Sequence, residues 1–160
     1  QAGANAVKIE GVCGHEDVIR YLVESGIPVM GHLGLTPQSI EQLGGFRVQG
    51  KDDFGREKIL RQAEKLQEAG CFSLILECIP SDLAWLVTQK VTIPTIGIGA
   101  GNLVDGQVLV FQDLMGVDKS FYPKFLKKYS DGHEQCFSSI QQFVQEVKGG
   151  VFPSRQESFQ

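Results

Sequence analysis

The chain has 160 residues, of which 42% are hydrophobic and 21% are charged, and its formal net charge is −4. These values predict one globular domain over residues 1–160 and exclude a disordered chain, because ten phenylalanines and many aliphatic residues can build a core. The acidic balance, without a stripe of lysine and arginine, argues against nucleic acid or an anionic membrane as a partner. No apolar run reaches the roughly 18–20 residues that a membrane-spanning helix needs.

Short apolar runs alternate with amphipathic segments along the chain. The pattern predicts strands at 7–10, 27–33, 72–79, 94–99 and 107–112, and helices at 16–25, 56–69, 81–89 and 134–148. A further helix start is predicted at Thr36-Pro37, and residues 43–55 are predicted to be a long loop. Five strands that are almost continuously apolar predict a parallel sheet covered on both faces.

Two architectures fit this alternation: an open doubly wound sheet and part of a (β/α)8 barrel. A dinucleotide-binding sheet needs a G-x-G-x-x-G motif after its first strand, whereas the glycine cluster Gly97–Gly101 has another spacing and comes late. That cluster could approach a phosphate closely or could simply permit tight packing. A complete barrel typically needs about 250 residues. The barrel interpretation therefore expects an upstream part, as does a chain that opens on Gln1 rather than Met.

Polar side chains interrupt or end the first three predicted strands. Lys8 and Glu10 lie two residues apart and leave the first strand on one face, His32 ends the second strand, and Glu77 ends the third. Catalytic groups gather at the carboxyl ends of parallel strands. Because its neighbours are apolar, we expect the pKa of Glu77 to be raised, which suits a general base. The alternative for each residue is a structural ion pair or a hydrogen-bonded core position.

The four cysteines predict a reducing compartment. Cys13, Cys71, Cys78 and Cys136 form no C-x-x-C pair and have no zinc-site spacing. We therefore expect a cytoplasmic protein.

Several segments, in this order, resemble the ketopantoate (3-methyl-2-oxobutanoate) hydroxymethyltransferase family. The resemblance runs end to end but covers only the carboxyl-terminal three-fifths of that family's chain. The segments that carry it are Val7–Gly11, Gly31–Ser39, Gly44–Gly50, Leu76–Pro80, Gly97–Gly101, Asp105–Gln107 and Tyr122–Phe125.

The resemblance implies a (β/α)8 TIM barrel of which about strands four to eight are present. It implies hydroxymethyl transfer from 5,10-methylenetetrahydrofolate to 3-methyl-2-oxobutanoate, giving 2-dehydropantoate, through a metal-stabilised enolate in pantothenate biosynthesis. A divalent metal, usually Mg²⁺, and a homo-oligomer, a decamer, are implied as well.

By the same resemblance, Glu77 matches the general base, Lys8 and His32 match substrate-binding positions, and Glu10 matches the acidic residue at the metal. The family's two aspartate metal ligands and a substrate-contacting serine lie upstream and are not in these 160 residues. We therefore expect this chain to be part of a longer enzyme and to be inactive alone. The alternatives are a carbon–carbon lyase of the pyruvate/phosphoenolpyruvate barrel group, and a truncated barrel that serves as an assembly or binding module.

Overall fold

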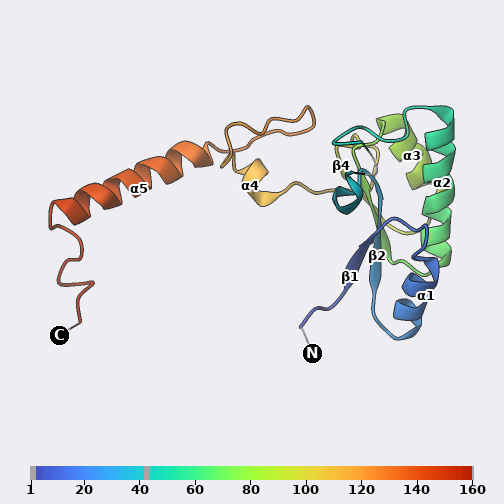
Figure 1. Cartoon of the computed structure of the whole chain (residues 1–160), viewed down its shortest axis with the longest axis horizontal. Helices are drawn as coiled ribbons and strands as arrows, with labels where there is room; N and C mark the ends of the chain where they lie inside the picture. Colours follow the sequence, from blue (N-terminus) through green and yellow to red (C-terminus); the bar gives the residue numbers. More distant parts are fainter. Residues whose placement is uncertain (1–2, 42–43, 160) are drawn as a thin grey trace. The chain divides into compact units, whose positions relative to one another are not determined.

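The computed structural model describes residues 3–41 and 44–159. The chain divides into two compact units, Gln1–Val108 and Leu109–Gln160. The first unit contains a sheet and its covering helices, coloured blue to yellow-green in Figure 1. Its elements are β1 (Val7–Glu10), α1 (Glu16–Glu24), β2 (Val29–Gly34), the 3-10 turn η1 (Pro37–Ser39), α2 (Asp53–Glu68), β3 (Ser73–Glu77), α3 (Ser81–Lys90), β4 (Thr95–Ile98) and β5 (Gly106–Gln107).

The five strands form one parallel sheet in the order β1-β2-β3-β4-β5, which confirms the predicted parallel α/β sheet. Each strand pairs with the next one along the chain. A doubly wound sheet reverses its strand order at a switch point, and the described strands contain no such reversal.

Helices α1, α2 and α3 lie along one face of this sheet (Figure 1). Gly31 in β2 faces α2 so closely that a Cβ atom there would lie 2.8 Å from Cδ1 of Leu66. Leu66, Leu74 and Leu83 are fully buried in the core between the helices and the sheet. Within residues 3–41 and 44–108, the expected helices on the second face of the sheet are not found, because α1, α2 and α3 all cover the same face.

Helix α2 begins at Asp53 rather than at residue 56 because Asp52 provides an N-cap. The Asp52 side chain accepts a hydrogen bond of 2.6 Å from the backbone N–H of Gly55. The loop predicted over 43–55 therefore ends at Asp52, three residues earlier than predicted. Position 43 lies outside the described residues. Thr36-Pro37 starts only the short turn η1.

The glycine cluster after β4 serves tight packing. A Cβ atom on Gly97 would lie 2.9 Å from Val104, and one on Gly101, whose φ is +80°, would lie 2.4 Å from the Cβ of Ser81. Nearby, Asp105 accepts hydrogen bonds from the N–H and the hydroxyl of the buried Thr95, at 2.8 and 3.0 Å. These contacts hold β4 and β5 together at the edge of the sheet.

The prediction of a strand over 107–112 is wrong for most of its length. Strand β5 contains only Gly106–Gln107, and the helix α4 (Phe111–Leu114) occupies part of the predicted strand. A short apolar run fits either a strand or a helix. The backbone hydrogen bonds between β4 and β5 end at Val108, whose N–H donates to the carbonyl of Gly97 at 3.0 Å.

The second unit contains α4 and the long helix α5 (Gly132–Lys148). Backbone hydrogen bonds from Tyr129 to Leu114 and from Gly132 to Met115, both 2.8 Å, join the segments before and after the connecting loop. Five apolar side chains of α5 are exposed: Phe137, Ile140, Phe143, Val144 and Val147. Among the residues that the structure describes, no helix is both long and apolar enough to span a membrane.

Candidate active site

The face of the sheet opposite the helices carries polar side chains at the ends of the first three strands. Side chains alternate along a strand, so Met30 and His32 point away from α2 when Gly31 points toward it. Glu10 lies directly across from His32 in the parallel register, and Glu77 lies across from Gly34. This register brings Glu10, His32 and Glu77 to one face at one edge of the sheet.

His32 lies between the two carboxylates. Its Nε2 is 3.1 Å from Oε2 of Glu77, and its Nδ1 is 3.8 Å from Oε1 of Glu10. The imidazole side chain is only 1% exposed, compared with 12% for Glu10 and 18% for Glu77. Neither ring nitrogen has hydrogen-bonding geometry to a partner among the described residues, so these are charge–dipole or charge–charge contacts. The two carboxylates offset the cost of burying the ring.

Glu10 is held from a second side by the turn after β2. Its Oε2 accepts the backbone N–H of Gln38, in η1, at 3.0 Å. Because Oε1 faces His32, both oxygens of this carboxylate are oriented by β2 and the turn that follows it.

The backbone around Glu77 is fixed by its neighbours. The Glu77 carbonyl accepts the N–H of Leu35 at 2.8 Å. Cys78 has a φ of +48°, which is uncommon for a residue with a side chain. Its N–H donates to the carbonyl of Ile98 and its own carbonyl accepts the N–H of Gln49, both at 2.9 Å. The left-handed turn at Cys78 therefore ends β3 at the residue that carries the carboxylate.

Sequence reasoning missed the contribution of Cys78 and Gln49. A positive φ at a cysteine leaves no mark in the sequence, and the partner of Gln49 is far from it along the chain. Burial, reinforced by the adjacent Glu77 charge, raises the pKa of the Cys78 thiol, which keeps it protonated beside the carboxylate.

Gly34 allows β2 to approach the end of β3. Its φ is +95°, and a Cβ atom built there would lie 2.1 Å from the carbonyl oxygen of Glu77. No side chain fits at that distance, so this position requires glycine.

Lys8 shares the face of β1 that carries Glu10. Its side chain is exposed, and within the described residues its ammonium has no carboxylate within 4.0 Å. The structure therefore brings together three of the four predicted site residues, and Lys8 stands on the same face without contacting them.

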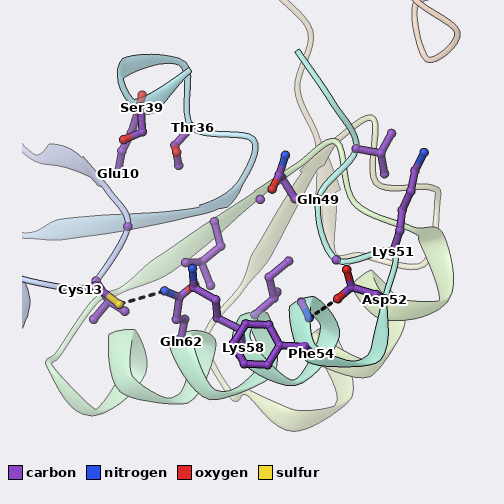
Figure 2. A pocket seen from close by; sticks show the side chains of 18 of the residues that line it. Glu10, Cys13, Thr36, Ser39, Gln49, Lys51, Asp52, Phe54, Lys58 and Gln62 are labelled. Atoms are coloured by element: carbon purple, nitrogen blue, oxygen red, sulfur yellow. Dashed lines mark hydrogen bonds between the residues drawn. The ribbon is translucent and has the colours of Figure 1, made fainter. Parts of the chain in front are cut away.

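A pocket of about 700 Å³ opens beside Glu10 and was not predicted from the sequence. Figure 2 shows Glu10, Thr36 and Ser39 on one side of it, and Lys58 and Gln62 of α2 on another. It combines residues of the loop after β1 with residues between β2 and α2 and of α2 itself, so no single local pattern could have indicated it.

The described residues do not by themselves form a magnesium site. No group of three or more His, Cys, Asp or Glu side chains that could hold a metal occurs among residues 3–41 and 44–159. Glu10 is the acidic residue that was predicted at the metal, and one of its oxygens already accepts the N–H of Gln38. It can therefore offer at most a single ligand or a contact through water.

Comparison with known proteins shows which family this chain resembles. The sequence profile of the family described as ketopantoate hydroxymethyltransferase matches residues 1–155. The 3-methyl-2-oxobutanoate hydroxymethyltransferase of Bdellovibrio bacteriovorus is 55% identical over 159 residues, which are 99% of this chain and 60% of that protein. Its namesake from Coxiella burnetii is 53% identical over 154 residues, which are 96% of this chain and 58% of that protein.

The chain therefore spans about three-fifths of the length of these relatives. Among solved structures, the YdjI aldolase from Escherichia coli K12 matches with a TM-score of 0.42 at 17% identity, covering 70% of this chain and 47% of that chain. A likeness at that level supports no argument about fold or function. The profile match and the identities, by contrast, extend over nearly the whole chain, and we conclude that it belongs to the ketopantoate hydroxymethyltransferase family.

Proposed function

We propose that this protein transfers a hydroxymethyl group from 5,10-methylenetetrahydrofolate to 3-methyl-2-oxobutanoate, giving 2-dehydropantoate for pantothenate biosynthesis. The family and the names of its relatives support the reaction. The structural observation that carries the proposal is the contact of 3.1 Å between His32 and Glu77, at the strand ends where α/β enzymes hold their catalytic groups.

In this proposal Glu77 is the general base. Its carboxylate takes the proton from C3 of the 2-oxo acid, and the resulting enolate attacks the one-carbon unit on the folate. Both bonds from the one-carbon unit to N5 and N10 of the folate break: one is replaced by the bond to C3 and the other by a bond to the oxygen of water. Tetrahydrofolate leaves with the two protons released by C3 and by water on its nitrogens. Glu77 suits the first step because its side chain is 18% exposed, which leaves it accessible to a small substrate, while the backbone around it is fixed.

Lys8 and His32 are proposed to bind and orient the substrate. The exposed Lys8 ammonium, without a carboxylate partner in the described part of the chain, is available for the substrate carboxylate. His32 is buried and contacts Glu77, so it also positions the base, in addition to the substrate-orienting role predicted from the sequence.

Mg²⁺ belongs to the proposal as an ion near Glu10. When bound it would polarise the keto oxygen and lower the cost of forming the enolate. Among the described residues, only Glu10 is proposed as a ligand of this ion. Oxygens of the substrate, water and residues outside this chain segment would have to supply the other ligands of Mg²⁺. Chelation with EDTA should abolish proton exchange at C3, and full exchange in EDTA would remove the metal from the proposal.

We further propose that both compact units belong to one (β/α)8 barrel domain. The sequential strand order, helices on a single face of the sheet, and a family match that runs through both units support this. A homo-oligomer, with a decamer as the expected form, is proposed from the family resemblance, and the exposed apolar side chains of α5 support association. A cytoplasmic location is proposed because the four cysteines are all free.

The test is formation of 2-dehydropantoate by the purified full-length enzyme with Mg²⁺ and both substrates, because the 160-residue chain is expected to be inactive alone. We expect product only when 5,10-methylenetetrahydrofolate is present. Retro-aldol cleavage of a hydroxy-2-oxo acid without folate would favour the lyase alternative. Absence of both product and C3 exchange would favour a binding or assembly module and contradict the proposal.

A further inference from the structure

The pocket beside Glu10 has a different chemical character from the strand-end site. Leu33 and Ile59 provide buried apolar walls, and the exposed side chains of Lys51, Phe54 and Lys58 also line it. Lys8, His32 and Glu77 are not among its lining residues. We call this space the α2 pocket, because α2 and the loop before it supply much of its wall. Its volume of about 700 Å³ is much larger than a five-carbon 2-oxo acid requires.

Two lysines of the α2 pocket are available for an anion. Neither Lys51 nor Lys58 has a carboxylate within 4.0 Å among the described residues. By contrast, Lys65 and Lys90, on the surface of the same unit, each contact a glutamate at 3.1 Å. Unpaired ammonium groups at a pocket, in a chain with a net charge of −4, favour a ligand that carries carboxylates or phosphates.

An aromatic ring also faces this space. Phe54, on the first turn of α2, lines the pocket and is 74% exposed (Figure 2). Exposing a phenyl ring to water is unfavourable, and its face is suited to stacking on another flat ring. The ligand indicated by these groups is therefore large, partly aromatic and anionic.

The α2 pocket is connected to the proposed base through Glu10. Glu10 lines the pocket, lies 3.8 Å from His32, and His32 lies 3.1 Å from Glu77. A ligand that fills the pocket thus reaches the strand-end site at Glu10, where the second substrate would react.

We propose that the α2 pocket binds the tetrahydrofolate co-substrate, with the glutamate carboxylates of its tail at Lys51 and Lys58 and an aromatic ring on Phe54. This inference rests on the proposed function, which requires a one-carbon donor. A reduced folate carries both flat rings and carboxylates, the two kinds of group that Phe54 and the two lysines are suited to hold.

The test is isothermal titration of the purified protein with 5-formyltetrahydrofolate, a stable reduced folate. The double variant Lys51→Gln/Lys58→Gln should raise Kd about tenfold or more, since each lost ion pair to a carboxylate costs a severalfold loss of affinity. Wild-type affinity should fall as salt is added, because exposed charge contacts are screened. Phe54→Ala should also weaken binding, and Phe54→Tyr should restore it.

The matched control is Lys90→Gln, which removes the same charge from an exposed position of the same unit outside the pocket. We expect it to change Kd less than twofold. The inference is overturned if Lys51→Gln/Lys58→Gln and Lys90→Gln bind the folate equally well, or if 3-methyl-2-oxobutanoate alone displaces it competitively. All four variants change exposed side chains, and thermal melting checks that each is folded.

Failure of this inference is distinguishable from failure of the proposed function. Exchange of the C3 proton of 3-methyl-2-oxobutanoate by the wild-type protein, measured without folate, tests only the base. If the C3 proton exchanges and the folate Kd is unchanged in Lys51→Gln/Lys58→Gln, only the assignment of the pocket is contradicted. Lysine-dependent folate binding without exchange or transfer supports the pocket and contradicts the proposed function.

Discussion

The Nε2 atom of His32 and the Oε2 atom of Glu77 lie 3.1 Å apart, on side chains from two neighbouring parallel strands. The imidazole is almost completely buried, whereas the carboxylate keeps some exposure. A buried ring beside a partly open carboxylate restricts where that carboxylate can point, which is a useful property in a base that must meet a carbon-bound proton.

Replacing His32 tests this positioning. In His32→Gln we expect the rate of C3 proton exchange to fall by about tenfold to a hundredfold, because a small misplacement of a catalytic group carries a cost of that order.

His133→Gln, in the second unit, is the control and should exchange like the wild type. Melting temperatures separate loss of fold from loss of positioning. A folded His32→Gln protein that exchanges the C3 proton at the wild-type rate would contradict the role of His32.

The close approach of β2 to Glu77 predicts that Gly34 cannot carry a side chain. Gly34→Ala combines a positive φ with a contact of 2.1 Å to a backbone oxygen, and we expect it to lower the free energy of unfolding by about 2–5 kcal/mol. Gly26→Ala is the matched control, because its φ is +82° with no atom within 4 Å of the added Cβ, and it should cost about 1–2 kcal/mol. Urea unfolding measures the free energy of unfolding of both variants. Equal decreases in the two variants would show that the contact at Gly34 costs nothing, which would contradict the prediction.

The cysteines should differ in reactivity. Burial raises the pKa of Cys71 to about 11, and burial together with the Glu77 charge raises the pKa of Cys78. A raised thiol pKa means less thiolate at any given pH, so alkylation at pH 8 should be slow for these two and should speed up as the pH rises. Cys13 and Cys136 are exposed and should react first.

Mass spectrometry after timed iodoacetamide treatment would read out this order. In urea all four cysteines should react at similar rates, which serves as the control. Labelling of Cys71 as fast as Cys136 in the folded protein would refute the prediction.

Several parts of this structure follow from sequence patterns. Helix α2 is predicted because apolar residues, among them Ile59, Ala63 and Leu66, repeat at helical spacing. These three residues are buried in the structure. The convergence of Glu10, His32 and Glu77 is predicted in outline, because parallel strands end at the same edge of a sheet.

Other parts depend on contacts that a sequence pattern does not encode. Three examples are the register that sets His32 directly across from Glu10, the positive φ of Cys78, and the pocket that combines the loop after β1 with α2 and the segment before it. Each depends on residues that are distant in the chain. The strand predicted over 107–112 is wrong for most of its length because short apolar runs do not distinguish a strand from a helix.

Helix α5 provides a test of assembly. Ile140 is 62% exposed, and a charge at that position should weaken a homo-oligomer that buries the apolar side chains of α5. Ile140→Glu should therefore shift the mass measured by light scattering toward the monomer. Gln141→Glu, which adds the same charge at the neighbouring exposed position, should not. A wild-type protein that is monomeric at micromolar concentrations would contradict the proposed assembly.

Deuterium exchange at C3 of 3-methyl-2-oxobutanoate, followed by NMR with Mg²⁺ and without folate, tests the role of Glu77 most directly. The full-length wild-type enzyme should catalyse exchange, and folded full-length Glu77→Gln should lose it by about a hundredfold or more, the usual contribution of a general base. Exchange that continues at the wild-type rate in Glu77→Gln would show that another group takes the proton.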